Sequence, residues 1–324
     1  MKAIISTQYG SPDVLQFAEI AQPMPQADEV LIKVHAATVT PSDCAFRKAD
    51  PFIIRLMYGL TKPRLAVPGV EFAGEIVAVG SAVTTFKAGD RVCGISPDRF
   101  GAQAEYLTLP VSKPLTLMSP HQSYAEAVGI VDGAATALLF LRDVAKVQRG
   151  QRVLINGASG AVGAYAVQIA KYYGAHVTGV CSAANVELVR SLGADAVIDY
   201  TREDFAKSGQ AYDVIFDAVG KRTYGQCQRA LTPQGIYMTT VPTLGTAVAL
   251  LRTARSRGKR AGFTTAGLKQ NRANLDFLTE LFDQGALRAV IDRCYPLAQV
   301  AEAHRYVETG RKKGNVIITV AEAA

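Results

Sequence analysis

A glycine-rich segment, Ala158–Gly163 (ASGAVG), lies between the apolar run 150–156 and the helical pattern that follows it. Glycine at position 160 lets the backbone approach a diphosphate, and Gly163 lets the helix pack tightly on the strand. Free N–H groups and the dipole at a helix start favour bound phosphates. Such turns also occur for purely structural reasons. Because strand and helix patterns continue to alternate after this segment, it predicts a dinucleotide-binding loop.

The end of the next strand indicates which dinucleotide binds. A carboxylate about 20 residues after the loop would hold the ribose 2′-hydroxyl of NAD. This chain has Val180-Cys181-Ser182 there, and Glu187 already falls within the following helical pattern. No carboxylate repels a 2′-phosphate at this point, and Ser182 and Tyr200 can donate hydrogen bonds to one. The sequence therefore favours NADP(H), although Tyr200 could instead cover the rim of the core.

Cysteines and histidines are the remaining candidates for chemistry. The five cysteines are widely spaced, their count is odd and no CxxC pair occurs, so a disulfide scaffold is not expected and a reducing compartment is favoured. The four histidines show no metal-ligand spacing. We therefore predict no bound metal. These residues are Cys44, Cys93, Cys181, Cys227, Cys294, His35, His121, His176 and His304.

The elements that position these residues fall into two regions. Roughly the first 125 residues hold eleven of the fourteen prolines, and the runs 30–40 and 72–80 are strand-like. Beyond them, helical patterns at 160–174 and 185–193 alternate with apolar runs, which predicts a parallel sheet covered on both faces. The runs are 150–156, 175–180, 196–199, 213–219 and 235–241. The last 60 or so residues have a helix–strand–helix–strand pattern.

Length and composition agree with a globular protein of two domains. The chain has 324 residues, 49% of them hydrophobic and 19% charged. A net charge of +7 favours anionic ligands, but the basic residues are mostly scattered, so we expect no nucleic-acid partner. No stretch approaches the roughly 18 apolar residues of a membrane span, and the first residues lack a signal-peptide pattern. We expect a cytoplasmic protein with no membrane partner.

Many segments in one order resemble the medium-chain dehydrogenase/reductase superfamily, in its zinc-independent quinone oxidoreductase branch. They include EVLIKVHAATVTPSD, PGVEFAGEIVAVGSAVTTFKAGDRVCG, GQRVLINGASGAVGAYAVQIAKYYGAHVTGVCS, LGADAVIDYTREDF, FDAVG and GRKKGNVIITV. The resemblance implies an α/β fold in which a Rossmann doubly wound parallel sheet is inserted into a GroES-like β-barrel domain. We expect the GroES-like substrate domain over 1–125 plus 266–324, the NADP(H)-binding domain over 126–265, and a homodimer.

The resemblance also bears on zinc. Zinc alcohol dehydrogenases of this superfamily carry a cysteine within the segment that here is Val39–Asp43 and a Gly-His-Glu where this chain has Gly69–Glu71. Thr40 and Val70 cannot replace a thiolate and an imidazole, and Cys44 lies four positions too late. Without a Lewis acid, alcohol oxidation is disadvantaged. This predicts zinc-free hydride transfer from NADPH to a quinone or an α,β-unsaturated carbonyl.

The cofactor residues of the family carry over by motif. Relatives often have a basic residue near position 185, where this chain has Asn185, and the family's Gly-Lys in the tail is Gly314-Asn315 here. The tail 311–313 could equally be a solvated turn. The implied residues are Ser159, Gly160, Ala161 and Val162 at the pyrophosphate; Ser182, Asn185 and Tyr200 at the 2′-phosphate; Ala218, Val219, Val241, Phe263 and Thr136 around the ribose and nicotinamide; and Arg311, Lys312 and Lys313 in the tail.

The proton donor is the least determined element. Candidates are Tyr58, Thr40 and solvent, while Asp43 could order its loop or act as an acid. An apolar stretch is expected to line the acceptor pocket, or to form a lid or a dimer surface. Its residues are Phe52, Ile53, Leu56, Met57 and Tyr58.

A basic stretch, 252–260 (RTARSRGKR), holds five Lys or Arg residues in nine. It could be a solvated surface, contact cofactor phosphates or bind an anionic partner. Some proteins of this family bind RNA, so two alternatives to a quinone or enone reductase stay open. One is a zinc-free, NADP-dependent alcohol or carbonyl oxidoreductase, and the other is a non-catalytic NADPH- or RNA-binding protein of the same fold. The intact Gly160 and Gly163 argue against the second.

Overall fold

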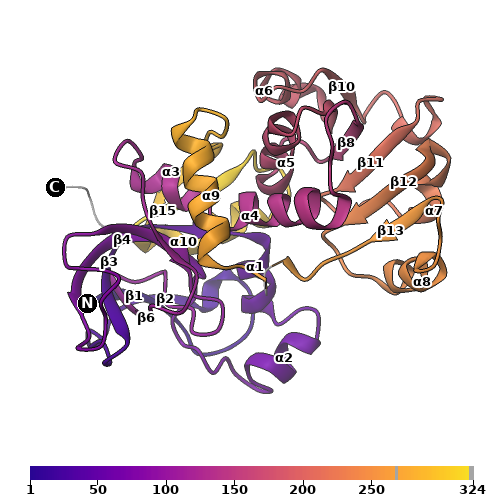
Figure 1. Cartoon of the computed structure of the whole chain (residues 1–324). Helices are drawn as coiled ribbons and strands as arrows, with labels where there is room; N and C mark the ends of the chain where they lie inside the picture. Colours follow the sequence, from indigo (N-terminus) through magenta and orange to yellow (C-terminus); the bar gives the residue numbers. More distant parts are fainter. Residues whose placement is uncertain (267–268, 321–324) are drawn as a thin grey trace. The chain divides into compact units, whose positions relative to one another are not determined.

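The structure, a computed structural model, describes residues 1–266 and 269–320. The chain forms two compact units (Figure 1). The first unit comprises Met1–Asp132, Gln270–Asp283 and the chain from Arg288 onward. The second comprises Gly133–Lys269 and Gln284–Leu287. The first unit is thus built from segments at both ends of the sequence, and the second from the middle.

The first unit contains a seven-stranded sheet in the order β14-β15-β3-β4-β5-β7, in which β6 also pairs with β3. The two predicted strands are confirmed as β3 and β4, which pair antiparallel. A separate hairpin joins β1 to β2. The strands are β1 (Lys2–Ser6), β2 (Leu15–Glu19), β3 (Glu29–Val39), β4 (Glu71–Val79), β5 (Arg91–Ile95), β6 (Tyr106–Pro110), β7 (Leu115–Leu117), β14 (Ile291–Pro296) and β15 (Asn315–Thr319).

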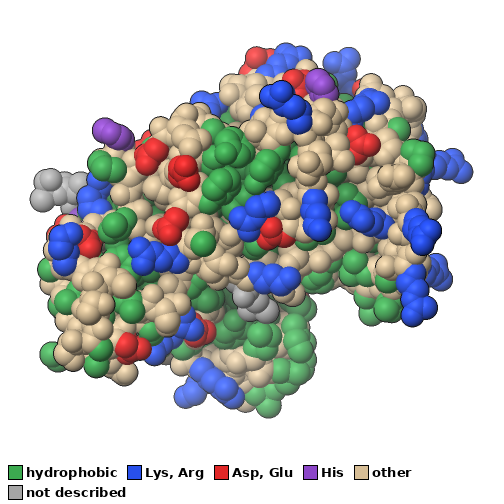
Figure 2. All heavy atoms as spheres, viewed as in Figure 1, with side chains coloured by type: hydrophobic (Ala, Val, Ile, Leu, Met, Phe, Trp, Pro, Cys, Tyr) green, Lys and Arg blue, Asp and Glu red, His purple; other side chains and the backbone are tan. Residues whose placement is uncertain are grey.

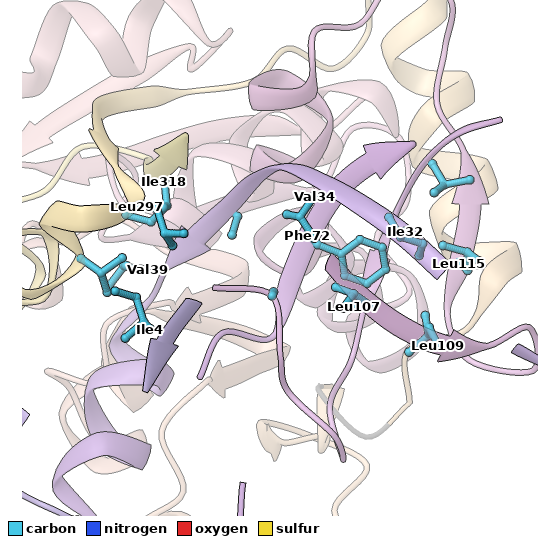
Figure 3. Packing of buried hydrophobic residues seen from close by; sticks show 14 of the residues in the cluster. Ile4, Ile32, Val34, Val39, Phe72, Leu107, Leu109, Leu115, Leu297 and Ile318 are labelled. Atoms are coloured by element: carbon cyan, nitrogen blue, oxygen red, sulfur yellow. The ribbon is translucent and has the colours of Figure 1, made fainter. Parts of the chain in front are cut away.

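The core of the first unit joins the two ends of the chain. Phe72 on β4 packs among side chains of β3 and β6, and Ile318 on β15 belongs to the same cluster as Ile4 on β1 (Figure 3). Because Phe72 and Ile318 are almost fully buried, separating the C-terminal strand would expose apolar surface. The helices of this unit are α1 (Pro41–Lys48), α2 (Ile53–Tyr58), α3 (Tyr124–Gly129), α9 (Arg272–Asp283) and α10 (Val300–Glu308).

The second unit is built on a six-stranded parallel sheet in the order β10-β9-β8-β11-β12-β13. The strand order reverses direction at β8, whose neighbours are β9 and β11. In such sheets ligands bind beyond the carboxyl ends of the strands at this switch point. The strands are β8 (Arg152–Asn156), β9 (His176–Cys181), β10 (Ala196–Asp199), β11 (Tyr212–Asp217), β12 (Leu231–Thr239) and β13 (Arg260–Gly262).

Helices connect the parallel strands, as the alternation predicts. α5 follows β8 directly and packs on β8 and β9, and α8 packs on the edge strand β13 (Figure 1). The helices are α4 (Asp132–Leu138), which continues into the π-helical Leu139–Ala145, then α5 (Ala161–Tyr172), α6 (Val186–Ser191), α7 (Tyr224–Cys227) and α8 (Leu244–Thr253). Short 3-10 turns occur at Pro12–Val14, Ala183–Asn185, Phe205–Lys207, Gln228–Ala230 and Leu297–Gln299.

One predicted boundary is wrong. The strand expected over 235–241 extends over Leu231–Thr239 instead. Pro233 and Gly235 interrupt the apolar pattern, yet the strand already pairs with β11 at Leu231 through an irregular register. Proline is tolerated in a strand where the pairing is irregular, so the sequence pattern places the start too late.

Candidate functional site

The loop between β8 and α5 has the geometry that its glycines predict. A Cβ on Gly163 would lie 2.0 Å from the carbonyl oxygen of Gly157, so the helix packs too closely for any side chain there. Gly160 is different: its φ is −81°, and the nearest atom to an added Cβ is 3.4 Å away. The protein's own packing therefore does not require glycine at 160. No side chain caps α5, so the N–H groups of its first turn remain available to a ligand.

Three polar side chains gather beside this loop. The Asn185 side-chain amide donates to Ser159 Oγ at 3.1 Å and to Ser182 Oγ at 3.3 Å. Asn185 Oδ1 is buried with no hydrogen-bond partner. The fold thus brings together three residues predicted for the pyrophosphate and the 2′-phosphate, at the carboxyl end of β9 and the start of the glycine-rich loop. They form a cluster of hydroxyl and amide groups.

The Asp199 carboxylate and the Tyr200 side chain lie at the end of β10. Tyr200 is 60% exposed, so it does not cover the core rim. Asp199 pairs in register with Cys181, which places it next to the end of β9. Its carboxylate accepts from the N–H and the hydroxyl of Thr201, and these hydrogen bonds lower the pKa of Asp199. An ionised carboxylate is therefore present near Ser182, but it is hydrogen-bonded to Thr201 within the turn that follows β10.

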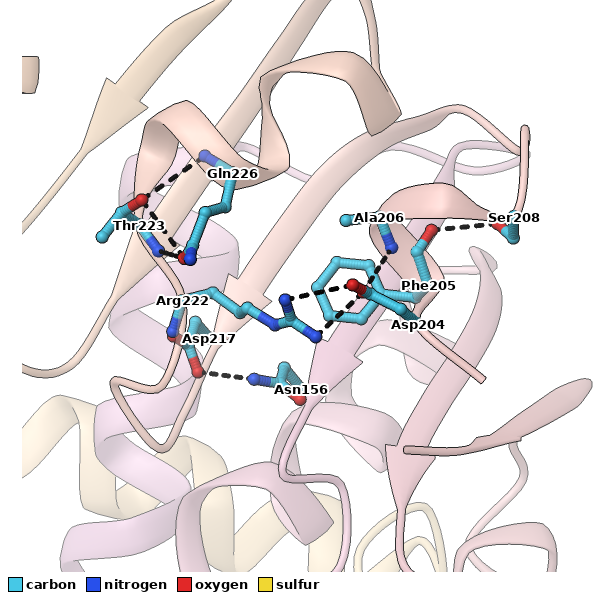
Figure 4. Close-up of polar contacts among 9 residues, drawn as sticks. All are labelled: Asn156, Asp204, Phe205, Ala206, Ser208, Asp217, Arg222, Thr223 and Gln226. Carbon is cyan, nitrogen blue, oxygen red and sulfur yellow. Dashed lines mark hydrogen bonds and ion pairs between the residues drawn. The ribbon is translucent and has the colours of Figure 1, made fainter. Parts of the chain in front are cut away.

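Asp217 organises the loop that carries Ala218 and Val219. Its fully buried carboxylate accepts from the Asn156 amide at 2.9 Å and from the Arg222 N–H at 2.7 Å (Figure 4). Val219 N–H adds a longer contact of 3.3 Å. Asp217 and Asn156 both end strands that flank the switch point. Sequence reasoning missed this pair, and the only signal was a polar residue directly after each buried apolar run.

Next to this loop the second unit contains a pocket that is open to solvent. Val241, predicted to flank the nicotinamide, lines it together with Lys221 and Arg222. Arg222 is held by an ion pair with Asp204 at 2.9 Å (Figure 4). The rest of the lining is mostly hydroxyl-bearing: Thr223, Thr239, Thr243 and Thr246. The pocket offers cationic and hydroxyl groups beside one predicted cofactor residue.

Four further predicted cofactor residues lie in the second unit. Thr136 is almost buried within α4. Phe263 follows β13, and its ring meets that of Phe140 edge-on with centroids 6.4 Å apart. Ala161 and Val162 form the first turn of α5, where backbone N–H groups point toward the loop.

In the first unit, Thr40 and Asp43 form a capping box at the start of α1. The Thr40 hydroxyl donates to Asp43 Oδ2 at 2.6 Å, the Thr40 N–H donates to the same oxygen at 2.8 Å, and Asp43 N–H donates back to Thr40 Oγ1. The T-x-x-D pattern is the sequence signal for this arrangement. Thr40 therefore holds the Asp43 carboxylate within Val39–Asp43, the segment in which the resemblance places a zinc-ligating cysteine in zinc enzymes.

The Asp43 carboxyl belongs to a buried acidic group. Burial raises the pKa of Asp43 from 3.8 to about 6, against the two hydrogen bonds from Thr40, and nearby Asp132 adds to the rise. Burial, with Asp132 and Asp43 as neighbours, also raises the pKa of Glu71 well above 4.5. Protons are thus held here at pH values where ordinary carboxyls are ionised.

Tyr58 and Asp43 line one small pocket within the first unit. The Tyr58 ring stacks on Phe100 with centroids 5.3 Å apart and meets Phe46 edge-on at 5.0 Å. Burial raises the pKa of Tyr58 above 10.0, and Asp98 adds to the rise, so the phenol keeps its proton. The structure therefore brings together two of the predicted proton donors. The other residues of the predicted apolar pocket, Phe52, Ile53, Leu56 and Met57, are exposed instead.

The tail 311–313 divides into exposed and half-buried residues. Arg311 and Lys313 are exposed, whereas Lys312 is half-buried and donates to the Gly314 carbonyl at 2.6 Å. Burial lowers the pKa of Lys312 from 10.5 to about 8, against the opposing effect of Glu71 and Asp292. Asn315 is a structural residue: its amide donates to the carbonyls of Gly129 and Val290.

A thiol and an imidazole meet in the first unit, where Cys44 Sγ lies 3.4 Å from His304 Nδ1. Burial raises the pKa of Cys44 to about 12 and lowers that of His304 to about 3, so both groups are neutral. Over residues 1–266 and 269–320, no group of three or more His, Cys, Asp or Glu side chains is arranged to hold a metal ion. Nor does any helix in these ranges have the length and hydropathy needed to span a membrane.

Two family models match this chain, and together they cover most of it. Residues 26–120 match the family model described as an alcohol dehydrogenase GroES-like domain, and residues 192–318 match the one described as a zinc-binding dehydrogenase. The chain is 33% identical to a spinach (Spinacia oleracea) chloroplastic quinone-oxidoreductase homolog, over 98% of both chains. It is 34% identical to a chloroplastic NADPH-dependent alkenal/one oxidoreductase of Arabidopsis thaliana, over 98% of this chain and 79% of that protein.

A solved structure is similar over nearly its whole length. The quinone oxidoreductase from Coxiella burnetii superimposes with a TM-score of 0.89 at 30% identity, covering 99% of each chain. The two units, the glycine-rich loop at the switch point and these relatives lead to one assignment. The chain belongs to the medium-chain dehydrogenase/reductase superfamily of nicotinamide-dependent oxidoreductases, in its quinone oxidoreductase branch.

Proposed function

We propose that this protein is an NADPH-dependent reductase of quinones or α,β-unsaturated carbonyls that works without catalytic zinc. The observation that carries the proposal is Gly160, which the protein's own packing leaves open at the uncapped start of α5. A glycine that no neighbouring atom requires is explained when a ligand needs the space. The diphosphate of a dinucleotide would occupy this position, bonded by the N–H groups of Ala161 and Val162.

The preference for NADPH rests on the group Ser159, Ser182 and Asn185. Their hydroxyl and amide groups can bond a 2′-phosphate, and no carboxylate follows β9 directly. Asp199 lies on the neighbouring strand, but its carboxylate is already bonded by Thr201. Tyr200 is exposed at the same edge and can donate a further hydrogen bond.

Zinc-free chemistry is supported by the donor set of the first unit. Thr40 commits its hydroxyl to Asp43, and Val70 has no donor atom. Cys44 and His304 supply two potential ligands, both buried and neutral, where a catalytic zinc site uses three. These residues do not fit a catalytic zinc ion, so acceptors that need no Lewis acid are the better substrates.

The bound nicotinamide would supply a hydride, and the chain's own residues would supply position and a proton. The loop 158–163 and the Asp217-ordered segment at Ala218 and Val219 would hold the cofactor in one orientation. Tyr58 would deliver the proton that an enone or a quinone takes up after the hydride. It retains that proton in the structure, whereas the Thr40 hydroxyl is bonded to Asp43.

A panel of acceptors tests the reaction. Purified protein would be mixed with NADPH or NADH and a quinone, an alkenal or a simple ketone, and cofactor oxidation followed by absorbance. We expect turnover of quinones or alkenals with NADPH, at a rate that chelation does not change, and less than one zinc per chain by metal analysis. Turnover of ketones alone, or activity that depends on bound zinc, would support a carbonyl or zinc-dependent oxidoreductase instead.

Variants test the two assigned positions. Gly160→Ala should weaken NADPH binding by about tenfold, because its Cβ occupies ligand space, with no loss of thermal stability. Gly225→Ala is the matched control, since an added Cβ there meets nothing within 4 Å. Tyr58→Phe should lower kcat by about a hundredfold and leave NADPH binding unchanged. We also propose a homodimer, which light scattering on the purified protein measures.

A further inference from the structure

The turn that follows Tyr58 is held by a hydrogen bond from the N-terminal segment of the chain. The Tyr9 hydroxyl donates to the Gly59 carbonyl at 2.7 Å, across 50 positions of sequence. Burial raises the pKa of Tyr9 above 10.0, against the opposing effect of Arg55 and Arg64, so the phenol keeps the proton that it donates. Tyr9 therefore acts directly on the residue next to the proposed proton donor.

The backbone of this turn is tightly constrained. Gly59 has a φ of +130°, and a Cβ there would lie 2.0 Å from the Lys62 carbonyl oxygen, so only glycine fits. The Arg64 N–H donates to the Tyr58 carbonyl at 2.8 Å and closes the turn. Because the turn is stiff, a movement of the Gly59 carbonyl is passed on to Tyr58, the residue before it.

Apolar packing within the first unit contributes little to the position of α2. Of the six residues of this helix, only Ile54 is buried. The side chains of Phe52 and Leu56 are 64% and 58% exposed, and Figure 2 shows green apolar side chains over the region of α2. Few buried contacts therefore share with the Tyr9 hydrogen bond the task of fixing the helix that ends at Tyr58.

Tyr9 is itself anchored from two sides. The Arg55 guanidinium lies 4.8 Å from the centroid of the Tyr9 ring, in a cation–π contact. The next residue, Gly10, accepts a hydrogen bond from the Arg47 guanidinium at 2.5 Å and donates its N–H to the Arg47 carbonyl at 3.1 Å. Arg47 is buried in α1, the helix that also carries Asp43. Tyr9 thus ties the end of α2 to the helix that holds the buried carboxyl.

We propose that Tyr9 is a positioning residue that sets the place of the Tyr58 hydroxyl for proton transfer. The inference rests on the proposed function, in which Tyr58 delivers the proton. Tyr9, Asp43 and Tyr58 line the same small pocket, so a shift of α2 changes the spacing of its proton-bearing groups. A misplacement of about 1 Å can lower the rate of a step by about a hundredfold, so one hydrogen bond at this turn has a measurable effect on kcat.

Steady-state kinetics of Tyr9→Phe test the proposal with the full chain. Loss of the hydroxyl should lower kcat about tenfold and leave the KM for NADPH unchanged, because no group at the proposed cofactor loop changes. The solvent deuterium isotope effect on kcat should increase, since proton transfer then limits the rate. A change in stability alone would not alter this isotope effect.

Tyr306→Phe is the matched control in the same unit. The Tyr306 hydroxyl donates to Asp292 at 2.6 Å, and the Arg293 guanidinium lies 3.8 Å from the centroid of its ring. The variant therefore loses the same kind of hydrogen bond beneath the same kind of cation–π contact. It should change neither kcat nor the isotope effect, and thermal melts would show that both variants fold.

A double variant separates positioning from general stability. With Tyr58→Phe there is no hydroxyl left to position, so Tyr9→Phe/Tyr58→Phe should have the kcat of Tyr58→Phe alone. A merely structural role of Tyr9 predicts instead that the losses of the two single variants multiply.

Two results would overturn the inference and leave the proposed function intact. One is a wild-type kcat for folded Tyr9→Phe while Tyr58→Phe is slow. The other is a slow Tyr9→Phe whose loss multiplies with that of Tyr58→Phe and whose isotope effect is that of the wild type. A wild-type kcat for Tyr58→Phe has another meaning, because it would remove Tyr58 as the proton donor and overturn both proposals.

Discussion

The side-chain amide of Asn185 bonds Ser159 Oγ at 3.1 Å, across 26 positions of sequence. The contact ties the turn before α6 to the glycine-rich loop before α5. A second bond from the same amide reaches Ser182 at 3.3 Å. Asn185 is thus a positioning residue that holds two hydroxyl groups on the proposed path of the cofactor.

Asn185→Ala should raise the KM for NADPH by about tenfold and leave kcat nearly unchanged. Two hydrogen bonds are lost, each contributing about 1 kcal/mol, but no group near the transferred hydride changes. Steady-state kinetics with saturating acceptor would measure both constants. Ser208→Ala, which removes a hydroxyl that donates to the Phe205 carbonyl and accepts from the Gln210 N–H, is the control and should change neither. An equal fall in kcat would contradict a purely positioning role.

Ser182→Asp should shift the coenzyme preference toward NADH by about tenfold or more in kcat/KM. A carboxylate at this position repels a 2′-phosphate and can accept from a ribose hydroxyl. Ser182→Ala separates the charge effect from loss of the hydroxyl and should lower NADPH affinity only slightly. If Ser182→Asp uses both coenzymes as the wild type does, Ser182 does not contact the 2′-phosphate and the proposed site is wrong.

Asp43→Asn should gain stability relative to the wild type as the pH rises from about 4 to about 7. The pKa of Asp43 is raised from 3.8 to about 6 by burial, so ionising it opposes folding once the pH passes the unfolded value. The difference amounts to roughly 3 kcal/mol when both states are ionised. Denaturant unfolding at several pH values measures it.

Asp98→Asn provides a control of opposite sign. A hydrogen bond from Lys113 lowers the pKa of Asp98, so this carboxylate stabilises the fold at neutral pH and less in acid. The variant should therefore lose stability relative to the wild type as the pH rises. A pH-independent difference for Asp43→Asn would show that the carboxyl is not buried as described.

Asp217→Ala should lower the free energy of unfolding by about 3 kcal/mol, because the Asn156 amide and the Arg222 N–H lose a buried acceptor. Asp213→Ala, on the same strand, is the matched control. Its carboxylate also accepts two bonds, from Arg152 N–H and the Thr232 hydroxyl, but in a more exposed position. Its loss should cost clearly less. Equal losses in the free energy of unfolding would mean that the buried hydrogen bonds of Asp217 stabilise the fold no more than the exposed ones of Asp213.

Local patterns were sufficient to predict much of the fold. β3, β4, β8 and α5 lie where alternation and helical spacing predict them, because each depends on neighbouring residues in the chain. The role of Gly163 in close packing followed from the loop motif in the same way. The start of β12 did not follow, since its irregular pairing with β11 overrides the local signal of Pro233 and Gly235.

The candidate site was predictable only in part. Its loop residues could be found from the sequence, but Asp217 with Asn156, and Asp199 beside Cys181, were missed because their strands lie far apart in the chain. In the same way, sequence alone could not show that Tyr58 and Asp43 share a pocket, or that Phe52 and Leu56 are exposed.

The amino-acid sequence by itself determined the strand–helix order, the glycine-rich loop between β8 and α5 and the resemblance to a known superfamily. Tertiary structure alone decided which polar groups are buried together and which apolar groups are left in water. Propensity and periodicity act between residues close in the chain, whereas burial depends on how distant segments pack. The buried carboxyl of Asp43 and the exposed side chains of Phe52 and Leu56 are consequences of that packing.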